Sequence, residues 1–404
     1  MSRSRTELAV VTWGAATFGA VLGSYSAFRP VRESIMVGGD PDRIPWLFLA
    51  TLAVTLAVSP VWGRLVARAP RHLVTTTFHG FAACTFAFAA ANHAGLAPVV
   101  VGRVFYVWAS LFGLFVVSVF WSLLADLLGP SIAQRLYGPI AAGGTAGAIV
   151  GPALTRALVD SVGLSGVLVM SGVMLELAVL GVARLRDVAR DLETDGGDRP
   201  VAGGAFDGLT HVAKSPYLRS IVGYVLCTSC AATFVYLAQA NIVHDAHLTD
   251  VDRTKLYASI DLWVNVATLA IQLVIAAPLI GRFGPGLVLC ALPVLQAIGI
   301  SVLVAAPTVA AVIAVQVVGR SATHGLTRPA RELLFTVVSR DDKYRAKNVI
   351  DTVGYRLGDT ASSWLGHGLT AVASGALVGA AMILVVGWIA LATLLGNGFR
   401  ARSS

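Results

Sequence analysis

The sequence predicts an all-α polytopic membrane protein with about 12 transmembrane helices in two six-helix halves. Of its 404 residues, 56% are hydrophobic and 13% are charged, whereas an ordinary soluble domain carries roughly 25% charged residues. The mean hydropathy is +0.75, and the strict alternation of a membrane β-barrel is absent from the sequence. Since one crossing needs about 20 apolar residues, the chain is long enough for about twelve crossings.

Apolar runs bounded by charged residues or by Gly and Pro predict the individual helices. They lie at 8–28, 45–63, 73–92, 98–125, 137–158 and 163–183, and then at 217–240, 254–280, 284–304, 308–336, 345–373 and 375–397. The first run follows Arg3 and Arg5 as a signal peptide would, but it is of spanning length and further spans follow, so we expect a first helix. The longest polar stretch predicts an N-terminal half at 1–183, a linker at 184–216 and a C-terminal half at 217–404.

Basic residues are concentrated on one predicted side of the membrane, and they account for the formal net charge of +8. That side holds Arg3, Arg5, Arg64, Arg68, Arg71, Arg135, Arg282, 340–347, Arg400, Arg402 and most basic residues of the linker. By the positive-inside rule, we expect both termini and the linker to be cytoplasmic. The excess of basic residues therefore indicates the orientation of the chain in the membrane, and we expect no nucleic-acid partner.

Two features of layout resemble the major facilitator superfamily. A single sequence offset places Arg135 on Arg345 and Gly144 on Gly354, as expected for a duplicated six-helix unit. The segment Gly63–Arg68 is similar to the cytoplasmic loop motif of that superfamily, with Ala67 where an Asp is usual. The resemblance implies a major-facilitator-like fold with a substrate site between the halves.

One five-residue pattern occurs twice, as Arg29-Pro30-Val31-Arg32-Glu33 after the first run and as Arg328-Pro329-Ala330-Arg331-Glu332 in the tenth. The two arginines of each motif share a helix face, and each proline predicts a discontinuous helix end. Guanidinium forks bind phosphate or carboxylate bidentately, and the glutamate can hold one arginine while the site is empty. Arginines that extend to the lipid headgroups are the alternative, but the repetition favours an anion site.

Two predicted spans carry polar stripes. The eighth places Asp261, Asn265, Thr268 and Gln272 on one helix face, which predicts cavity lining rather than contact between helices. The eleventh places Asp351, Tyr355 and Asp359 on one face, and Arg356 is spaced to pair with Asp359. A charge in an apolar span costs roughly 2.5 to 3.5 kcal/mol, so both stripes face protein or water. For the eleventh span, pore lining and ion pairing between helices remain equal alternatives.

Other patterns have plainer interpretations. Gly143, Gly147 and Gly151 follow small-xxx-small spacing before Pro152 and predict close helix packing. The four cysteines lie within apolar runs, which favours packing over a disulfide or zinc site. The sequence contains no P-loop, nucleophile elbow or HExxH motif. We therefore expect no enzymatic activity and no cofactor.

Several segments resemble the ATP/ADP translocase family, in particular its short bacterial major-facilitator-like relatives. The resemblance is carried by Tyr25–Glu33, Phe120–Asp126, Gln134–Gly138, Arg328–Glu332 and Lys347–Gly358. It implies exchange of nucleotides and a bacterial inner membrane, and it places Arg32 and Arg331 at the positions of two functional lysines of the family. The family's carboxylate in the fourth span has no counterpart in 98–125, and that in the seventh falls near Gln239 or Asn241.

These patterns together predict a secondary-active transporter that exchanges an anionic phosphorylated metabolite, such as a nucleotide, by alternating access and functions as a monomer in the lipid bilayer. The expected substrate-binding residues are Arg29, Arg32, Glu33, Arg328, Arg331, Glu332, Asp261, Asn265, Asp351, Tyr355, Arg356 and Asp359. The two arginine motifs form either one shared site or two gates. A proton-coupled exporter of lipophilic or cationic compounds, for which the antiporter-like segment Gly147–Pro152 is the indication, and a non-transporting membrane sensor or assembly factor are the alternatives. Glu176 in the sixth span is an isolated carboxylate that favours an interfacial position over a role in proton coupling.

Overall fold

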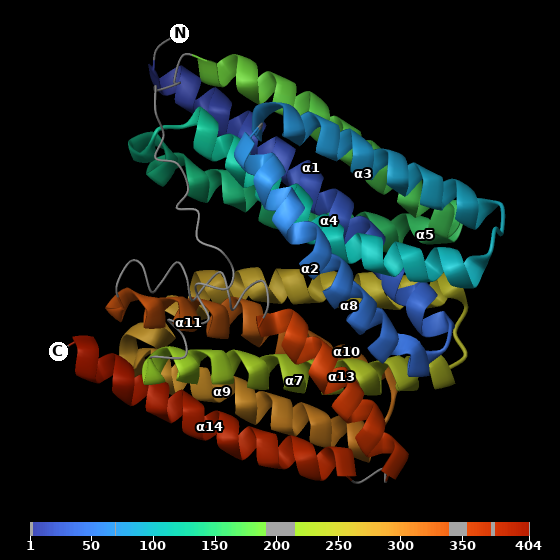
Figure 1. The fold of residues 1–404 in the computed structure, drawn as a ribbon, viewed down its shortest axis with the longest axis vertical. Coiled ribbons are helices and arrows are strands. Elements are labelled where there is room, and N and C mark those ends of the chain that lie inside the picture. Colours follow the sequence, from blue (N-terminus) through green and yellow to red (C-terminus); the bar gives the residue numbers. More distant parts are fainter. Residues whose placement is uncertain (1–2, 69, 191–214, 339–353, 373–375, 404) are drawn as a thin grey trace. The chain divides into compact units, whose positions relative to one another are not determined.

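In a computed structural model of the chain, the described residues are 3–68, 70–190, 215–338, 354–372 and 376–403, and they are helices joined by short turns (Figure 1). The first part comprises α1 (Arg3–Gly38), η1 (Pro41–Arg43), α2 (Ile44–Arg68), α3 (Pro70–His93), α4 (Pro98–Leu127) and α5 (Pro130–Ala189). The second comprises α7 (Pro216–Asp245), α8 (Asp250–Ala270), η3 (Ile271–Ala276), α9 (Ala277–Ala305), α10 (Val309–Ala322), η4 (Thr323–Thr327), α11 (Arg328–Leu334), η5 (Phe335–Val337), α13 (Tyr355–Val372) and α14 (Ala376–Ser403). Both η3 and η4 are π-helical.

Within the described ranges, 9 helices are long and apolar enough to cross a membrane. The two longest, Ile132–Ala189 and Asp250–Ala305, each contain two of the predicted spans, and α13 belongs to the remaining one. The turn within each long helix lies at a glycine, Gly163 with φ 66° and Gly284 with φ 75°. Only glycine adopts such a φ without strain, so the chain reverses there without a loop. The prediction of an all-α polytopic membrane protein is confirmed.

The chain divides into two compact units, and neither is continuous in sequence. The first unit contains Met1–Gly39, Ala53–Pro200 and Leu248–Asn265. The second contains Asp40–Leu52, Val201–His247 and Val266–Ser404. The part of α8 up to Asn265 therefore belongs to the same unit as α1, α3, α4 and α5, while the start of α2 belongs to the unit of the C-terminal helices.

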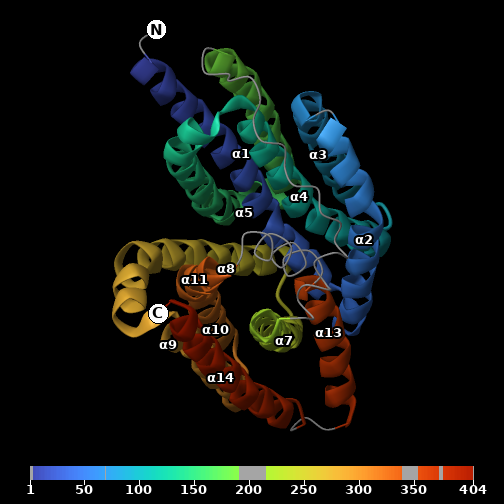
Figure 2. The same cartoon turned by 60° about the vertical axis from the view of Figure 1, so that its left-hand side comes forward.

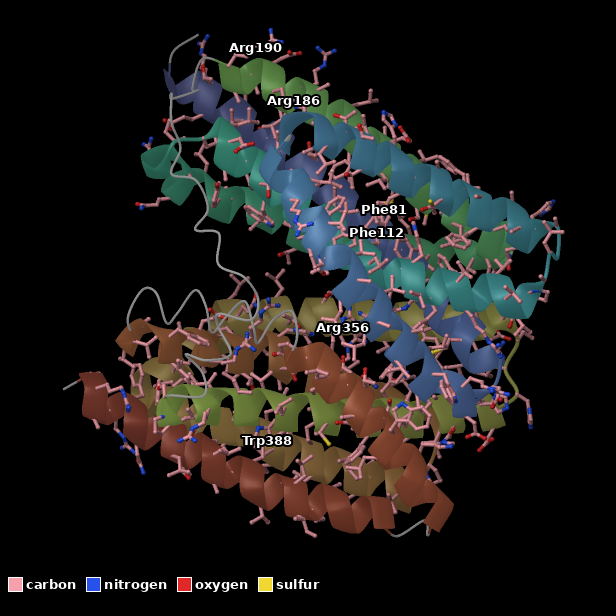
Figure 3. All side chains as sticks on the ribbon, viewed as in Figure 1. Phe81, Phe112, Arg186, Arg190, Arg356 and Trp388 are labelled. Carbon is pink, nitrogen blue, oxygen red and sulfur yellow. The ribbon has the colours of Figure 1, made fainter. Side chains whose placement is uncertain are left out.

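Each unit has its own core. In the first unit, Phe81 of α3 and Phe28 of α1 both meet the ring of Phe112 of α4 edge-on, with centroids 5.2 and 5.0 Å from it (Figure 3). In the second, α14 lies along α9, and Trp388 of α14 packs against Tyr224 of α7 with centroids 5.6 Å apart (Figures 2 and 3). Tyr224 also donates a 2.9 Å hydrogen bond to the carbonyl of Leu289, which lacks a helical donor because Pro293 has no N–H.

Close contact between α1 and α5 depends on small residues. A Cβ added at Gly143, Gly147 or Gly151 of α5 would collide with the backbone of Ala15, Gly19 or Gly23 of α1, respectively. The small residues recur every four positions on both helices, so the two backbones meet along several turns. The close helix packing predicted for the fifth span is confirmed.

We expect Gly147→Ala to destabilise the first unit by about 1–3 kcal/mol, because the added methyl group must push two helix backbones apart. Gly138→Ala is the matched control, since its Cβ would meet nothing within 4 Å on the same helix, and helix propensity favours Ala equally at both sites. Thermal melting of the purified protein in detergent measures the difference. Equal melting temperatures for the two variants would contradict backbone contact at Gly147.

Candidate functional site

The first arginine motif lies inside α1, two turns before the helix ends at Gly38. The predicted discontinuous helix end is therefore wrong here, because Pro30 removes a single N–H while α1 remains packed along α5. At the second motif the helix also continues, from Val309 to Val337, so the predicted discontinuity is wrong there too, but the turn directly before Arg328 is the π-helical η4. The same sequence pattern thus lies in regular helix once and after a distorted turn once.

The second arginine of the first motif is enclosed by a carboxylate and an aromatic ring. Arg32 pairs with Glu33, and its guanidinium carbon lies 5.0 Å from the ring centroid of Tyr106 on α4. The side chains of Arg32 and Glu33 are 12% and 7% exposed. An arginine over an aromatic face gains cation–π attraction in addition to its ion pair.

The second motif repeats this arrangement in the second unit. Arg331 pairs with Glu332 at 3.3 Å and donates a 2.5 Å hydrogen bond to the hydroxyl of Tyr355. Its guanidinium carbon lies 5.8 Å from the centroid of the Tyr355 ring, and its side chain is 5% exposed. Each unit therefore contains an Arg–Glu–Tyr triad, which we define as Arg32, Glu33 and Tyr106 in the first unit and Arg331, Glu332 and Tyr355 in the second.

The leading arginines of the two motifs differ. Arg29 forms a 3.3 Å ion pair with Asp261 of α8, and the two side chains are 30% and 6% exposed. Arg328 is exposed at the start of α11. The structure thus joins the first motif to the polar stripe of α8 within the first unit.

The rest of that stripe contacts neighbouring helices. Asn265 donates a 2.7 Å hydrogen bond to the carbonyl of Ala148 in α5, an acceptor without a helical donor because residue 152 is proline. In the second unit, Gln272 donates a 3.2 Å hydrogen bond to the carbonyl of His324 in η4. Three members of the stripe, Asp261 included, therefore hold helices together.

We expect Asn265→Val to destabilise the protein by about 1–3 kcal/mol, because the carbonyl of Ala148 loses its donor. Adding Pro152→Ala supplies a backbone N–H to the same carbonyl and should recover part of the loss. Melting of the two single variants and the double variant forms a double-mutant cycle. Strictly additive effects would contradict the link between Asn265 and Pro152.

The polar stripe of the eleventh span is described from Tyr355 onward, and Asp351 lies outside the described residues. Asp359, one turn after Tyr355, accepts a hydrogen bond from Ser229 of α7. Arg356 lies between them in α13 and is half-buried (Figure 3). The predicted pairing of Arg356 with Asp359 remains a prediction.

Two participants escaped the sequence analysis. Tyr106 lies in the predicted span 98–125, which contains no carboxylate, and no sequence pattern distinguishes it from the other aromatic residues of that span. His79 of α3 pairs with Glu176 in the second limb of α5, with Nδ1 and Oε2 2.9 Å apart and side chains 53% and 37% exposed. Among the described residues no group of three or more His, Cys, Asp or Glu could hold a metal ion.

Similarity to known proteins identifies the family. The Major Facilitator Superfamily model matches residues 12–331. The chain belongs to the major facilitator superfamily. A search among curated proteins finds no match.

Solved structures with this fold include major-facilitator-like transporters. A bacterial homologue of the iron transporter ferroportin, in an inward-facing state, has a TM-score of 0.62 at 13% identity over 100% of both chains. A bacterial homologue of the human lysosomal transporter Spinster has a TM-score of 0.56 at 13% identity over 99% of this chain and 98% of that chain. The nucleoside transporter NupG has a TM-score of 0.58 at 12% identity over 99% and 100%. This major facilitator protein is a multi-pass membrane transporter and not an enzyme.

Proposed function

We propose that this transporter exchanges an anionic phosphorylated metabolite, such as a nucleotide, by alternating access. The observation that carries the proposal is the Arg–Glu–Tyr triad that occurs once in each unit. A repeated buried arginine is costly to maintain in a membrane protein and is typical of functional sites. Substrate sites of this superfamily form from both halves.

Each triad has the chemistry of an exchangeable anion site. In the structure the adjacent glutamate neutralises the arginine, while the tyrosine ring lies over or beside the guanidinium. A phosphate oxygen pair would replace the carboxylate and accept two parallel N–H bonds from the fork. Arg32 and Arg331 are therefore the main anion ligands of the proposal, with Arg29 and Arg328 in supporting roles.

Nucleotides are the favoured phosphorylated class because the resemblance to ATP/ADP translocases includes both motifs. Arginine stands where that family has lysine, and arginine favours bidentate over point contact with phosphate. Exchange of one anion for another also limits net charge movement, which costs about 2.3 kcal/mol per charge per 100 mV. We propose a bacterial plasma membrane location, cytoplasmic termini, and a monomer with halves at 1–183 and 217–404.

The test is uptake of labelled ATP by liposomes that contain the purified protein. We expect uptake into vesicles loaded with unlabelled ADP, and little uptake into empty vesicles or into loaded vesicles without protein. Thermal melting of the purified protein, before it is placed in liposomes, checks that it is folded. No uptake by folded protein under these conditions would exclude nucleotide exchange.

Proton-coupled export is the second candidate, and the His79–Glu176 pair favours it. Both residues lie well inside apolar helices, where a titratable pair is typical of proton-translocating proteins. If this function is correct, an imposed pH gradient drives efflux of a lipophilic cation and Glu176→Gln abolishes it. Efflux that is independent of the gradient would exclude this candidate.

A further inference from the structure

Tyr25 lies on the same face of α1 as the two arginines of the first motif, one turn before Arg29 and two turns before Arg32. Tyr25 is half-buried, and it acts electrostatically on Arg29, whose side chain is 30% exposed. Because an α-helix rises about 1.5 Å per residue, Tyr25 and Arg29 are about 6 Å apart along the axis, and Arg32 follows about 4.5 Å further on. One face of α1 thus carries an aromatic ring and then two cations.

The ring of Tyr25 is held by aromatic neighbours. It stacks with Phe112 of α4, with centroids 5.8 Å apart and an interplanar angle of 19°, and it meets Phe28 edge-on at 5.4 Å. A Cβ added at Gly113 of α4 would lie 3.5 Å from the Tyr25 ring, so the small residue lets this ring lie against the backbone of α4. Since the ring is fixed before any ligand arrives, stacking a planar group on it costs little side-chain entropy.

We propose that Tyr25 stacks on the base of a nucleotide whose phosphates bind Arg29 and Arg32. This inference rests on the proposed function, because it assumes that the first motif binds a phosphorylated anion. In a nucleotide the sugar joins the base to the first phosphate through about six bonds, which places them on the order of 6 Å apart. That separation matches the rise from Tyr25 to Arg29, and further phosphates then extend toward Arg32.

An aromatic ring at this place recognises the class of substrate rather than one base. Every base has a π-face, and stacking needs no matched hydrogen bonds. In proteins that bind single-stranded nucleic acids, one such contact strengthens binding by roughly tenfold. A sugar phosphate has no planar ring to stack. Tyr25 therefore separates nucleotides from other phosphorylated metabolites without separating one nucleotide from another.

Two ligand pairs test the proposal by binding to the purified protein. ADP is compared with inorganic pyrophosphate, and AMP is compared with ribose 5-phosphate, so that only one member of each pair carries a base. We expect the natural protein to bind the nucleotide of at least one pair at least about tenfold more tightly than its base-free partner. Tyr25→Leu should bring that ratio close to one by weakening the nucleotide alone, whereas Tyr25→Phe keeps the ring and should keep most of the ratio.

Control variants separate recognition from packing. Tyr137→Leu removes another half-buried tyrosine of the first unit, which contacts Trp121 edge-on, and should leave the ratio unchanged. If Tyr25→Leu does not fold, Tyr25→Met replaces it, because methionine fills space without an aromatic face. Equal binding of both members by the natural protein, or an equal loss for both in the variant without the ring, overturns this inference alone. Binding of no phosphorylated ligand by folded natural protein overturns the proposed function and this inference with it.

Discussion

Replacing Arg331 by glutamine is expected to lower the rate of anion uptake by at least about 30-fold. Arg331 is 5% exposed, pairs with Glu332 and donates to Tyr355, so no neighbouring solvent replaces the lost charge. Loss of one buried charged partner typically costs 2–5 kcal/mol, and 2 kcal/mol corresponds to roughly 30-fold. Initial rates of labelled ATP uptake into ADP-loaded vesicles measure the effect.

Three further variants make this result specific. Arg331→Lys keeps the charge but not the fork, so we expect an intermediate rate. Tyr355→Phe removes the hydroxyl and keeps the ring, so its effect should be smaller than that of Arg331→Gln. Arg400→Gln removes an exposed arginine of α14 and should leave uptake unchanged. Equal uptake by Arg331→Gln and natural protein would show that the second triad does not bind the anion.

The location of the helices was predictable because it depends on local hydropathy. The predicted boundaries at 158–163 and 280–284 lie at or beside Gly163 and Gly284, where the chain turns. The first helix was predicted too short, since α1 continues from residue 28 to Gly38. The charges of Arg29, Arg32 and Glu33 indicated a helix end. In the structure these side chains lie inside α1, where they form ion pairs and are half-buried or buried.

Contacts within the site were less predictable. The spacing of Asp261 and Asn265 indicated one helix face, which the structure retains, but it does not specify which helix that face meets. Asp261 reaches Arg29 across 232 positions of sequence, and no local pattern encodes such a separation. The place of Tyr106 in the first triad was unpredictable for the same reason, because its partner Arg32 belongs to another helix.

Reversing the charge of either member of the Arg29–Asp261 pair is expected to destabilise the first unit by about 3 kcal/mol, since each single variant puts like charges together at a partly buried place. Arg29→Asp faces the carboxylate of Asp261, and Asp261→Arg faces the guanidinium of Arg29. The double variant restores an ion pair of opposite polarity and should recover most of the stability. Arg282→Asp, at an exposed position of α9, is the control for reversing a charge without breaking this pair.

Transport by the double variant distinguishes a structural pair from a substrate-binding one. If the pair only holds α1 against α8, restored stability should bring restored uptake. Because we assign Arg29 to the anion, we expect the double variant to fold while anion uptake stays at least about tenfold below that of the natural protein. Melting in detergent and uptake by vesicles from the same preparation give the two readouts. A double variant no more stable than the single variants would mean that the two side chains do not depend on each other for the stability of the first unit.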